Sequence, residues 1–445
     1  MNRFILVLLT GVLLGPAGAQ QPVPRVQPLP LAVPGDPYED ITGEYMLARV
    51  GEIVEFSHQA QRDGLKLWGR IAGTVYAHRT AEYMEARFKE LGLNDVRTER
   101  FPTGYPQWWP IDSEVRLAGG PVLTSAIPAH PTAKAKGGSP STPEEGIEAE
   151  MVYVGLGRPA DLVGKDLKGK IAVMRSLPRP SAYAHTAQAA AAVLKGRGHV
   201  GLIVIFDIPG NYSSAANFLC GYGDCEVPTF QVGAQDGAKI EAAITRGPAK
   251  IRLRLKTEVK TGLEGHNVMA LLPGSSDEYI VLIAHTDSWF EGASDNASGL
   301  AALLAIARHF AAVPREKRSR NVLFVATEGH HAGSPGTAWL ASRHKDVLAK
   351  AALVINCEHL ATTLVVHTGN GLVRTNTETP RTLVVTRAAP GLLRIAMEAV
   401  NRYGITLAGE VSVDRYAGDV SPLRDAAVTT LSIMDVSLVG YHVSG

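Results

Sequence analysis

Four short apolar segments, each followed by side chains that can bind a metal ion, constrain the fold of this chain more than any other feature. The first, Val281–Ala284, is followed at once by His285 and two residues later by Asp287. A carboxylate at that spacing can orient a metal-binding imidazole. The next acid, Asp295, precedes an apolar stretch, Leu300–Phe310, with helical periodicity. A strand, loop and helix of this kind place both side chains at the C-terminal edge of a sheet, where open α/β folds bind their ligands.

The other three segments repeat this pattern of a β-type run that ends in possible metal ligands. They are Asn321–Thr327, followed by Glu328, His330 and His331; Ala352–Cys357, followed by Glu358 and His359; and Thr429–Met434, followed after a short loop by Tyr441 and His442. Side chains of these types at neighbouring strand ends predict two adjacent divalent metal ions bridged by one carboxylate.

Taken jointly, these residues resemble the zinc exopeptidases with two co-catalytic metals, which include bacterial leucyl aminopeptidase and glutamate carboxypeptidase II. The resemblance covers roughly residues 65 to 445, and its motifs are Gly69–Thr74 (R-x-x-G-T), His285–Asp287 (H-x-D), Asp295–Gly299 (D-N-x-x-G), Ile355–Glu358 (I-N-x-acid), Gly418–Leu423 (similar to S-D-H-x-P-F) and Tyr441-His442. It implies the metal ligands His285, Asp295, His331, Glu358 and His442. Asp295 would bridge the two metals, and Asp287 would lie behind His285.

The chain departs from the family at one pair of residues. Where the family has two glutamates, a proton-transfer group followed by a metal ligand, this chain has His330 and His331. His331 keeps a donor atom for zinc, but a negative charge is lost, so we expect one or two Zn²⁺ ions per chain. His330 is one candidate for proton transfer. Glu328 is the other, because residues two apart point the same way on a continuing strand.

The resemblance implies an aminopeptidase- or carboxypeptidase-type hydrolase that cleaves peptide bonds with metal-bound hydroxide. The histidine at position 330 leaves an alternative open, namely a catalytically impaired relative that serves as a metal- or peptide-binding module. An amide hydrolase or cyclising transferase on the same scaffold is a third possibility, because a fold does not fix a reaction. The expected partner is a peptide or small amide substrate.

Composition and the N-terminal residues limit the class of protein and predict its location. The chain has 44 Lys and Arg against 43 Asp and Glu, a net charge of +1, which argues against a nucleic-acid surface. Residues 1–19 have the charged start, short apolar run and Ala17-Gly18-Ala19 ending of a cleavable secretory signal. No apolar run is long enough to span a bilayer. We therefore expect a secreted or periplasmic protein without stable membrane insertion.

The expected fold is a three-layer α/β/α zinc-exopeptidase fold with a mixed central sheet and an inserted, β-rich protease-associated domain. The predicted segments are a signal peptide (1–19), a Pro-rich lead-in (20–36), the N-terminal part of the peptidase domain (37–115), the insertion (116–258) and the C-terminal part of the peptidase domain (259–445). Family members usually continue past the last ligand, so we expect either a truncated chain or a fold that closes differently.

The three cysteines agree with export. Cys220 and Cys225 lie close together in a glycine-rich loop and are expected to form a small disulfide in an oxidising compartment, the alternative being two free thiols. Cys357 falls on a predicted core strand and is expected to be a buried thiol.

Overall fold

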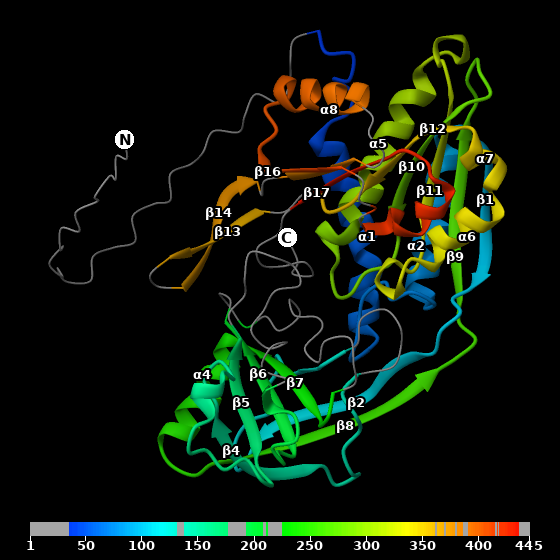
Figure 1. Ribbon diagram of the computed structural model, residues 1–445. Coiled ribbons are helices and arrows are strands. Elements are labelled where there is room, and N and C mark those ends of the chain that lie inside the picture. The colour runs from blue at the N-terminus through cyan, green and yellow to red at the C-terminus, as the bar shows by residue number, and fades with distance from the viewer. Residues whose placement is uncertain are drawn as a thin grey trace, which may run out of the picture.

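The described part of the chain forms two units, each built around its own β-sheet (Figure 1). The computed structural model describes residues 35–130, 138–176, 193–207, 211, 225–360, 363–368, 371–378, 381–385, 390–413, 416 and 418–435. The larger sheet has the order β1-β9-β11-β10-β12-β17-β15-β16, and the smaller has the order β2-β8-β4-β5-β6-β7-β3. A separate ribbon pairs β13 (Thr363–Thr368) with β14 (Gly371–Glu378).

The larger sheet brings the predicted strand ends to one edge. Its strands are β1 (Asn94–Pro102), β9 (Glu264–Leu272), β10 (Tyr279–His285), β11 (Asn321–Thr327), β12 (Ala351–Cys357), β15 (Arg381–Val385), β16 (Leu407–Val413) and β17 (Thr430–Asp435). β10 pairs in parallel with β11 and β12, and β12 pairs in parallel with β17. β9 pairs antiparallel with β11, so the sheet is mixed as predicted. The C-terminal ends of the four parallel strands therefore meet at the same edge.

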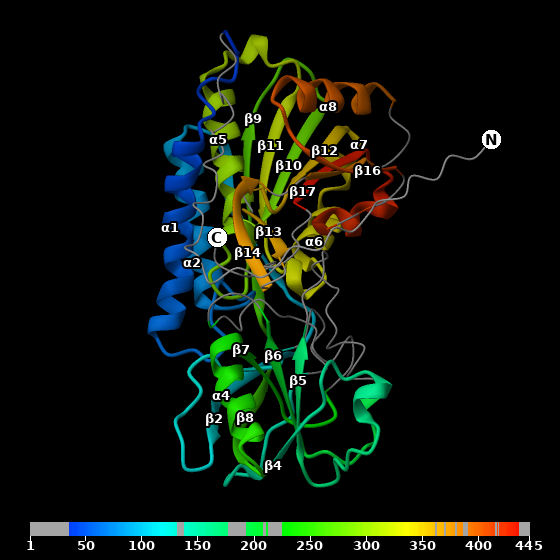
Figure 2. The same ribbon diagram turned by 90° about the vertical axis from the view of Figure 1, so that its left-hand side faces the viewer.

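Helices cover both faces of this sheet (Figure 2). One layer contains α1 (Gly43–Arg62), α2 (Val75–Glu90) and α5 (Ser298–Ala312), and the other contains α6 (Pro335–Arg343), α7 (Lys345–Ala349) and the 3₁₀ segment η5 (Gly418–Ala426). Successive residues of a strand pack against different helix layers, because their side chains point to opposite faces of the sheet. Leu282 and Phe324 pack with the first layer, whereas Ile283 and Val325 pack with the second. The predicted three-layer α/β/α fold is confirmed.

The smaller unit lies between the two sequence parts of the larger one. It contains β2 (Gln107–Leu117), β3 (Ile127–Pro128), β4 (Ile147–Tyr153), β5 (Ile171–Ser176), β6 (Gly201–Phe206), β7 (Thr229–Gly233), β8 (Lys250–Lys260) and α4 (Ala234–Thr245). Its two faces have separate hydrophobic cores, which include Met174 on one side and Ile203 on the other. The long strands β2 and β8 lead toward the larger unit (Figure 1). The identification of this unit as a protease-associated domain stays a prediction.

Several predictions from the sequence fall on residues outside the described ranges. The signal peptide, most of the lead-in, Cys220 and His442 are among them. Cys225 is disulfide-bonded, and Cys357 is a buried free thiol, as predicted. In the ranges given above, no helix combines the length and apolar character that crossing a bilayer requires.

Candidate metal centre

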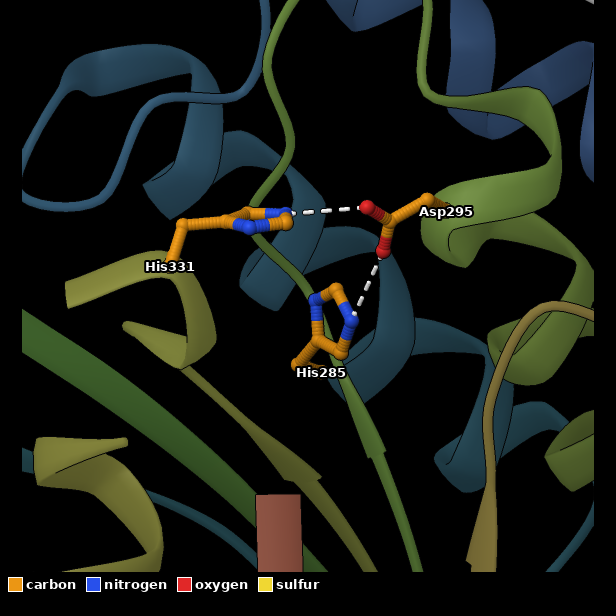
Figure 3. A group of neighbouring side chains, drawn as sticks. All are labelled: His285, Asp295 and His331. Atoms are coloured by element: carbon orange, nitrogen blue, oxygen red, sulfur yellow. Dashed lines mark ion pairs between the residues drawn. The ribbon is translucent and has the colours of Figure 1, made fainter. Parts of the chain in front are cut away.

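Asp295 is buried between two histidines at the C-terminal edge of the larger sheet. His285 ends β10, and Asp295 lies in the single turn η2 (Ala293–Ala297) that leads into α5. Figure 3 shows the carboxylate between the two imidazoles: Oδ1 is 3.0 Å from Nε2 of His285, and Oδ2 is 3.2 Å from Nε2 of His331. Asp295 thus faces a different histidine with each oxygen, an arrangement suited to a bridging ligand.

A second group of possible ligands shares His285. Nε2 of His330 is 3.3 Å from Oε1 of Glu358, and the rings of His330 and His285 are stacked with centroids 4.2 Å apart. The ligand atoms of His285, His330 and Glu358 all lie within 4.8 Å of one another, as do those of His285, Asp295 and His331. The structure therefore brings together four of the five predicted ligands, and the fifth, His442, lies outside the described residues.

The donor atoms fit a zinc ion. Nε2 of His285 and Oε1 of Glu358 are buried and make no hydrogen bond within the described part of the chain. Ligand atoms around a tetrahedral zinc ion at about 2.0 to 2.1 Å lie about 3.3 Å apart, and the observed contacts are 3.0 to 3.3 Å. Burial outweighs the nearby Asp295 and lowers the pKa of His331, which favours the neutral imidazole that binds metal.

Asp287 supports the centre in two ways. Its main-chain carbonyl oxygen is 2.9 Å from Nδ1 of His285, whereas its carboxylate is 3.7 Å from the same nitrogen. The carboxylate instead accepts hydrogen bonds from the backbone N–H groups of Gly329, His330 and His331, at 2.7, 3.0 and 3.2 Å. Asp287 therefore fixes the ring of His285 through its backbone and the His330-His331 turn through its side chain.

A turn at Gly329 separates Glu328 from His330. The strand that was expected to continue ends at Thr327, and Gly329, with φ of 95°, turns the chain into a short 3₁₀ segment, η4 (His330–Ala332). The two side chains therefore do not share a strand face, contrary to the prediction. The Glu328 carboxylate accepts hydrogen bonds from the backbone N–H groups of Gly73, at 2.7 Å, and His266, at 2.9 Å. Burial raises the pKa of Glu328 to about 8.

Arg70 holds the loop that joins His285 to Asp295. Its guanidinium group is fully buried and donates hydrogen bonds to the carbonyl oxygens of Thr286, Glu291 and Gly292, at 3.1, 3.0 and 3.0 Å, and to the hydroxyl of Ser57 at 2.7 Å. Burial lowers the pKa of Arg70 to about 10, although Asp295 and Asp287 oppose this shift. The R-x-x-G-T motif marked this residue in the sequence, but no role was predicted for it.

Two further side chains outside the predicted set of ligands lie in the centre. Nε2 of His359 is 2.9 Å from Oδ1 of Asp295. Oδ1 of Asp419 is 3.5 Å from Nδ1 of His330, and its other oxygen accepts a hydrogen bond from the hydroxyl of Thr327. The signal for Asp419 was its place in the motif Gly418–Leu423, and for His359 its position directly after Glu358.

Gly299, the glycine of the D-N-x-x-G motif, lies close to the backbone of β12, and a substitution can test this contact. A Cβ atom on Gly299 would collide with the backbone oxygen of Cys357 in β12. We expect Gly299→Ala to lower the free energy of unfolding by about 1–3 kcal/mol, because α5 must shift from the sheet. Gly51, inside α1 with open space around it, is the control. Gly51→Ala should stabilise by up to about 1 kcal/mol, and equal effects in urea unfolding would contradict the packing argument.

Comparison with known proteins agrees with this geometry. Residues 267–443 match the model of peptidase family M28. A probable glutamate carboxypeptidase VP8 of Zea mays is 26% identical over 358 residues, which is 65% of this chain and 48% of that protein. Aminopeptidase YwaD of Bacillus subtilis is 27% identical over 264 residues, 58% of this chain and 51% of that protein. The chain thus spans about half the length of these curated relatives.

Solved structures share the fold. A zinc aminopeptidase from Bacillus subtilis superimposes with a TM-score of 0.60 at 18% identity, over 89% of this chain and 85% of that one. A peptidase M28 precursor from Shewanella amazonensis gives a TM-score of 0.58 at 19% identity, over 88% of this chain and 89% of that one. The resemblance predicted from the strand-end motifs is confirmed: the chain resembles the peptidases of family M28 in sequence over residues 267–443 and the zinc aminopeptidases in fold.

Proposed function

We propose that the protein is an exported, zinc-dependent exopeptidase that hydrolyses a terminal peptide bond. The observation that carries this proposal is the burial of Asp295 between His285 and His331, each imidazole facing a different carboxylate oxygen. The named activities of the relatives, an aminopeptidase and a probable glutamate carboxypeptidase, support an exopeptidase of one of these two types. The signal-like N-terminus supports export to the periplasm or the medium.

The residues of the centre have two different roles in such a reaction, metal binding and positioning of the metal ligands. His285, Asp295, His331 and Glu358 would hold zinc, which supplies Lewis acidity that makes a water molecule more acidic and polarises a carbonyl group. Arg70 and Asp287 keep the two ligand-bearing loops in place through backbone hydrogen bonds. Such fixed positioning matters, since ligands displaced by an ångström lose much of their effect on rate.

Proton transfer to the leaving amine has two candidate groups. His330 lies among the ligands, with its side chain 10% exposed. Glu328 is closer in type to the family's carboxylate, and a pKa of about 8 lies near the pH at which general acids and bases work best. Each oxygen of Glu328 already accepts one hydrogen bond, from the backbone N–H group of Gly73 or of His266, so Glu328 would take part through a remaining lone pair.

The test is metal content and turnover measured together on the purified full-length chain. We expect plasma emission spectroscopy to find one or two zinc ions per chain, and hydrolysis of aminoacyl or peptidyl reporters to cease on chelation and return with zinc. Glu328→Gln should lower kcat by about 100-fold if Glu328 moves the proton. His344→Ala is the control, because His344 pairs with Glu99 away from the centre. A chain without zinc and without turnover would overturn the proposal.

One observation favours a second candidate function, a metal- or peptide-binding module without turnover. Both glutamates of the family's pair are histidines here, and both oxygens of the remaining candidate for proton transfer, Glu328, accept hydrogen bonds from backbone N–H groups. Such a protein would bind zinc and peptides but hydrolyse none. Zinc binding without turnover of any reporter in the panel would select this function over the first.

A further inference from the structure

The ring of His331 lies flat against the indole of Trp289. The two ring centroids are 4.4 Å apart, and the ring planes differ by 25°. The rings of His285 and His330 meet the ring of His331 at nearly right angles instead, with interplanar angles of 86° and 83°. Trp289 therefore covers one face of the imidazole whose Nε2 is 3.2 Å from Oδ2 of Asp295.

The backbone around Trp289 is fixed on both sides. The N–H group of Ser288 donates a hydrogen bond to the carbonyl oxygen of Arg70 at 3.0 Å, and the N–H group of Phe290 donates to that of Trp68 at 2.8 Å. Trp289 itself is only 6% exposed. Because both neighbours are held and the side chain is buried, the indole has little freedom to move away from His331.

The smaller unit also contacts this indole. His130, two residues after β3, lies against Trp289 with ring centroids 4.6 Å apart and an interplanar angle of 58°. Trp108 and Trp109 of β2 belong to the same hydrophobic cluster as Trp289. Residues of the smaller unit therefore reach His331 through Trp289.

An indole is suited to support an imidazole that binds a metal ion. The hydrogen bond from the backbone of His331 to Asp287 fixes the main chain, but the orientation of the ring depends on side-chain torsions. A flat partner limits the rotation of the ring. An imidazole that shares its lone pair with a dication also gains positive character, which strengthens its attraction to the electron-rich face of an indole.

We propose that Trp289 is a positioning residue, which orients the imidazole of His331 for metal binding, and that the smaller unit assists by packing His130 against the indole. This proposal rests on the proposed function, because it requires that His331 binds zinc. It gives the smaller unit a part in the metal centre of the larger one.

Cobalt binding by the purified full-length chain tests this role without turnover. Metal-free protein is titrated with Co²⁺ while its visible absorption is recorded, because these bands respond to the geometry of the ligands. We expect Trp289→Leu to weaken cobalt binding by about 10-fold, the lower end of the cost of losing a group that orients a metal ligand, and to change the spectrum. Trp289→Phe keeps a flat ring and should bind cobalt more tightly than Trp289→Leu.

Trp339→Leu is the matched control. The indole of Trp339 stacks on Phe101 and donates a hydrogen bond to Glu99, and these residues lie outside both groups of possible ligands. We expect Trp339→Leu to lower the free energy of unfolding in urea but to keep the cobalt affinity and spectrum of the wild type. A residue with a merely structural role behaves in this way, so the same result for Trp289→Leu would overturn the proposal.

The outcomes separate this proposal from the proposed function. If His331→Ala loses cobalt affinity whereas folded Trp289→Leu keeps it, the role of Trp289 is wrong and the zinc centre stands. If the wild type binds neither cobalt nor zinc, both fail. Should circular dichroism show that Trp289→Leu does not fold, tryptophan fluorescence decides. Zinc should change the emission of the wild type but not that of Trp289→Phe, and an equal change in both would contradict the proposal.

Discussion

Replacing Arg70 by methionine should lower the free energy of unfolding by about 3–5 kcal/mol, the cost of breaking a buried charged network. The methionine would fill part of the space but would leave the carbonyl oxygens of Thr286, Glu291 and Gly292 without their donor. It would also remove the positive charge beside Asp287 and Asp295. Urea unfolding in the presence of chelator measures the effect, because chelation excludes a contribution from metal binding.

Arg62→Met is the matched control for Arg70. Arg62 forms an ion pair with Glu55 at the surface, where its side chain is 57% exposed. Such pairs contribute about 0–1 kcal/mol. If the two substitutions lower stability equally, the loop between His285 and Asp295 does not depend on Arg70, and the positioning role given to it above is wrong.

Zinc should stabilise the folded chain, and His285→Ala should abolish this effect. A ligand that binds only the folded state, present at about 1,000 times its Kd, stabilises by about 4 kcal/mol. His285 belongs to both groups of possible ligands, so its loss affects whichever is occupied. We expect thermal unfolding of the metal-free wild type to move to higher temperature on addition of zinc, and that of His285→Ala to remain unchanged.

Two results bear on the zinc prediction. His344→Ala should respond to zinc like the wild type, because His344 lies outside both ligand groups. A zinc-dependent increase in stability that persists undiminished in His285→Ala would show that the ion binds elsewhere, and the centre described above would have to be abandoned. The measurement needs no substrate, so it holds for an active enzyme and for a binding module alike.

The sequence predicted the strands that build the centre because their signals are local. β11 has the predicted bounds, Asn321–Thr327, and β12 and β17 differ from prediction by a residue at their ends. Each is a short apolar run interrupted by polar residues at its end. Helix α1 was not predicted. Its buried face includes Ser57 and Ala60 beside Ile53 and Val54, so its apolar periodicity is weak, and it packs against α2 and α5.

The parts of the site that escaped prediction depend on contacts between distant segments. Arg70 donates to the carbonyl oxygen of Glu291, and Asp419 reaches His330, yet neither relation leaves a spacing in the sequence. The continuation of the strand through Glu328 to His330 was predicted wrongly for a local reason. Gly329 ends the strand with a left-handed conformation, and alternation of side chains cannot be extended across such a residue.

The three backbone N–H groups that Asp287 holds have a consequence for how this centre can change. Their hydrogen bonds fix residues 329–331 through the main chain, whatever side chains stand there. A glutamate or a histidine at position 330 or 331 is therefore compatible with the same backbone hydrogen bonds. An exchange at position 331 would alter the charge and softness of the ligand set, and with them the metals that the site prefers. The backbone of the turn can thus stay the same while its side chains, and with them the metal preference of the centre, differ.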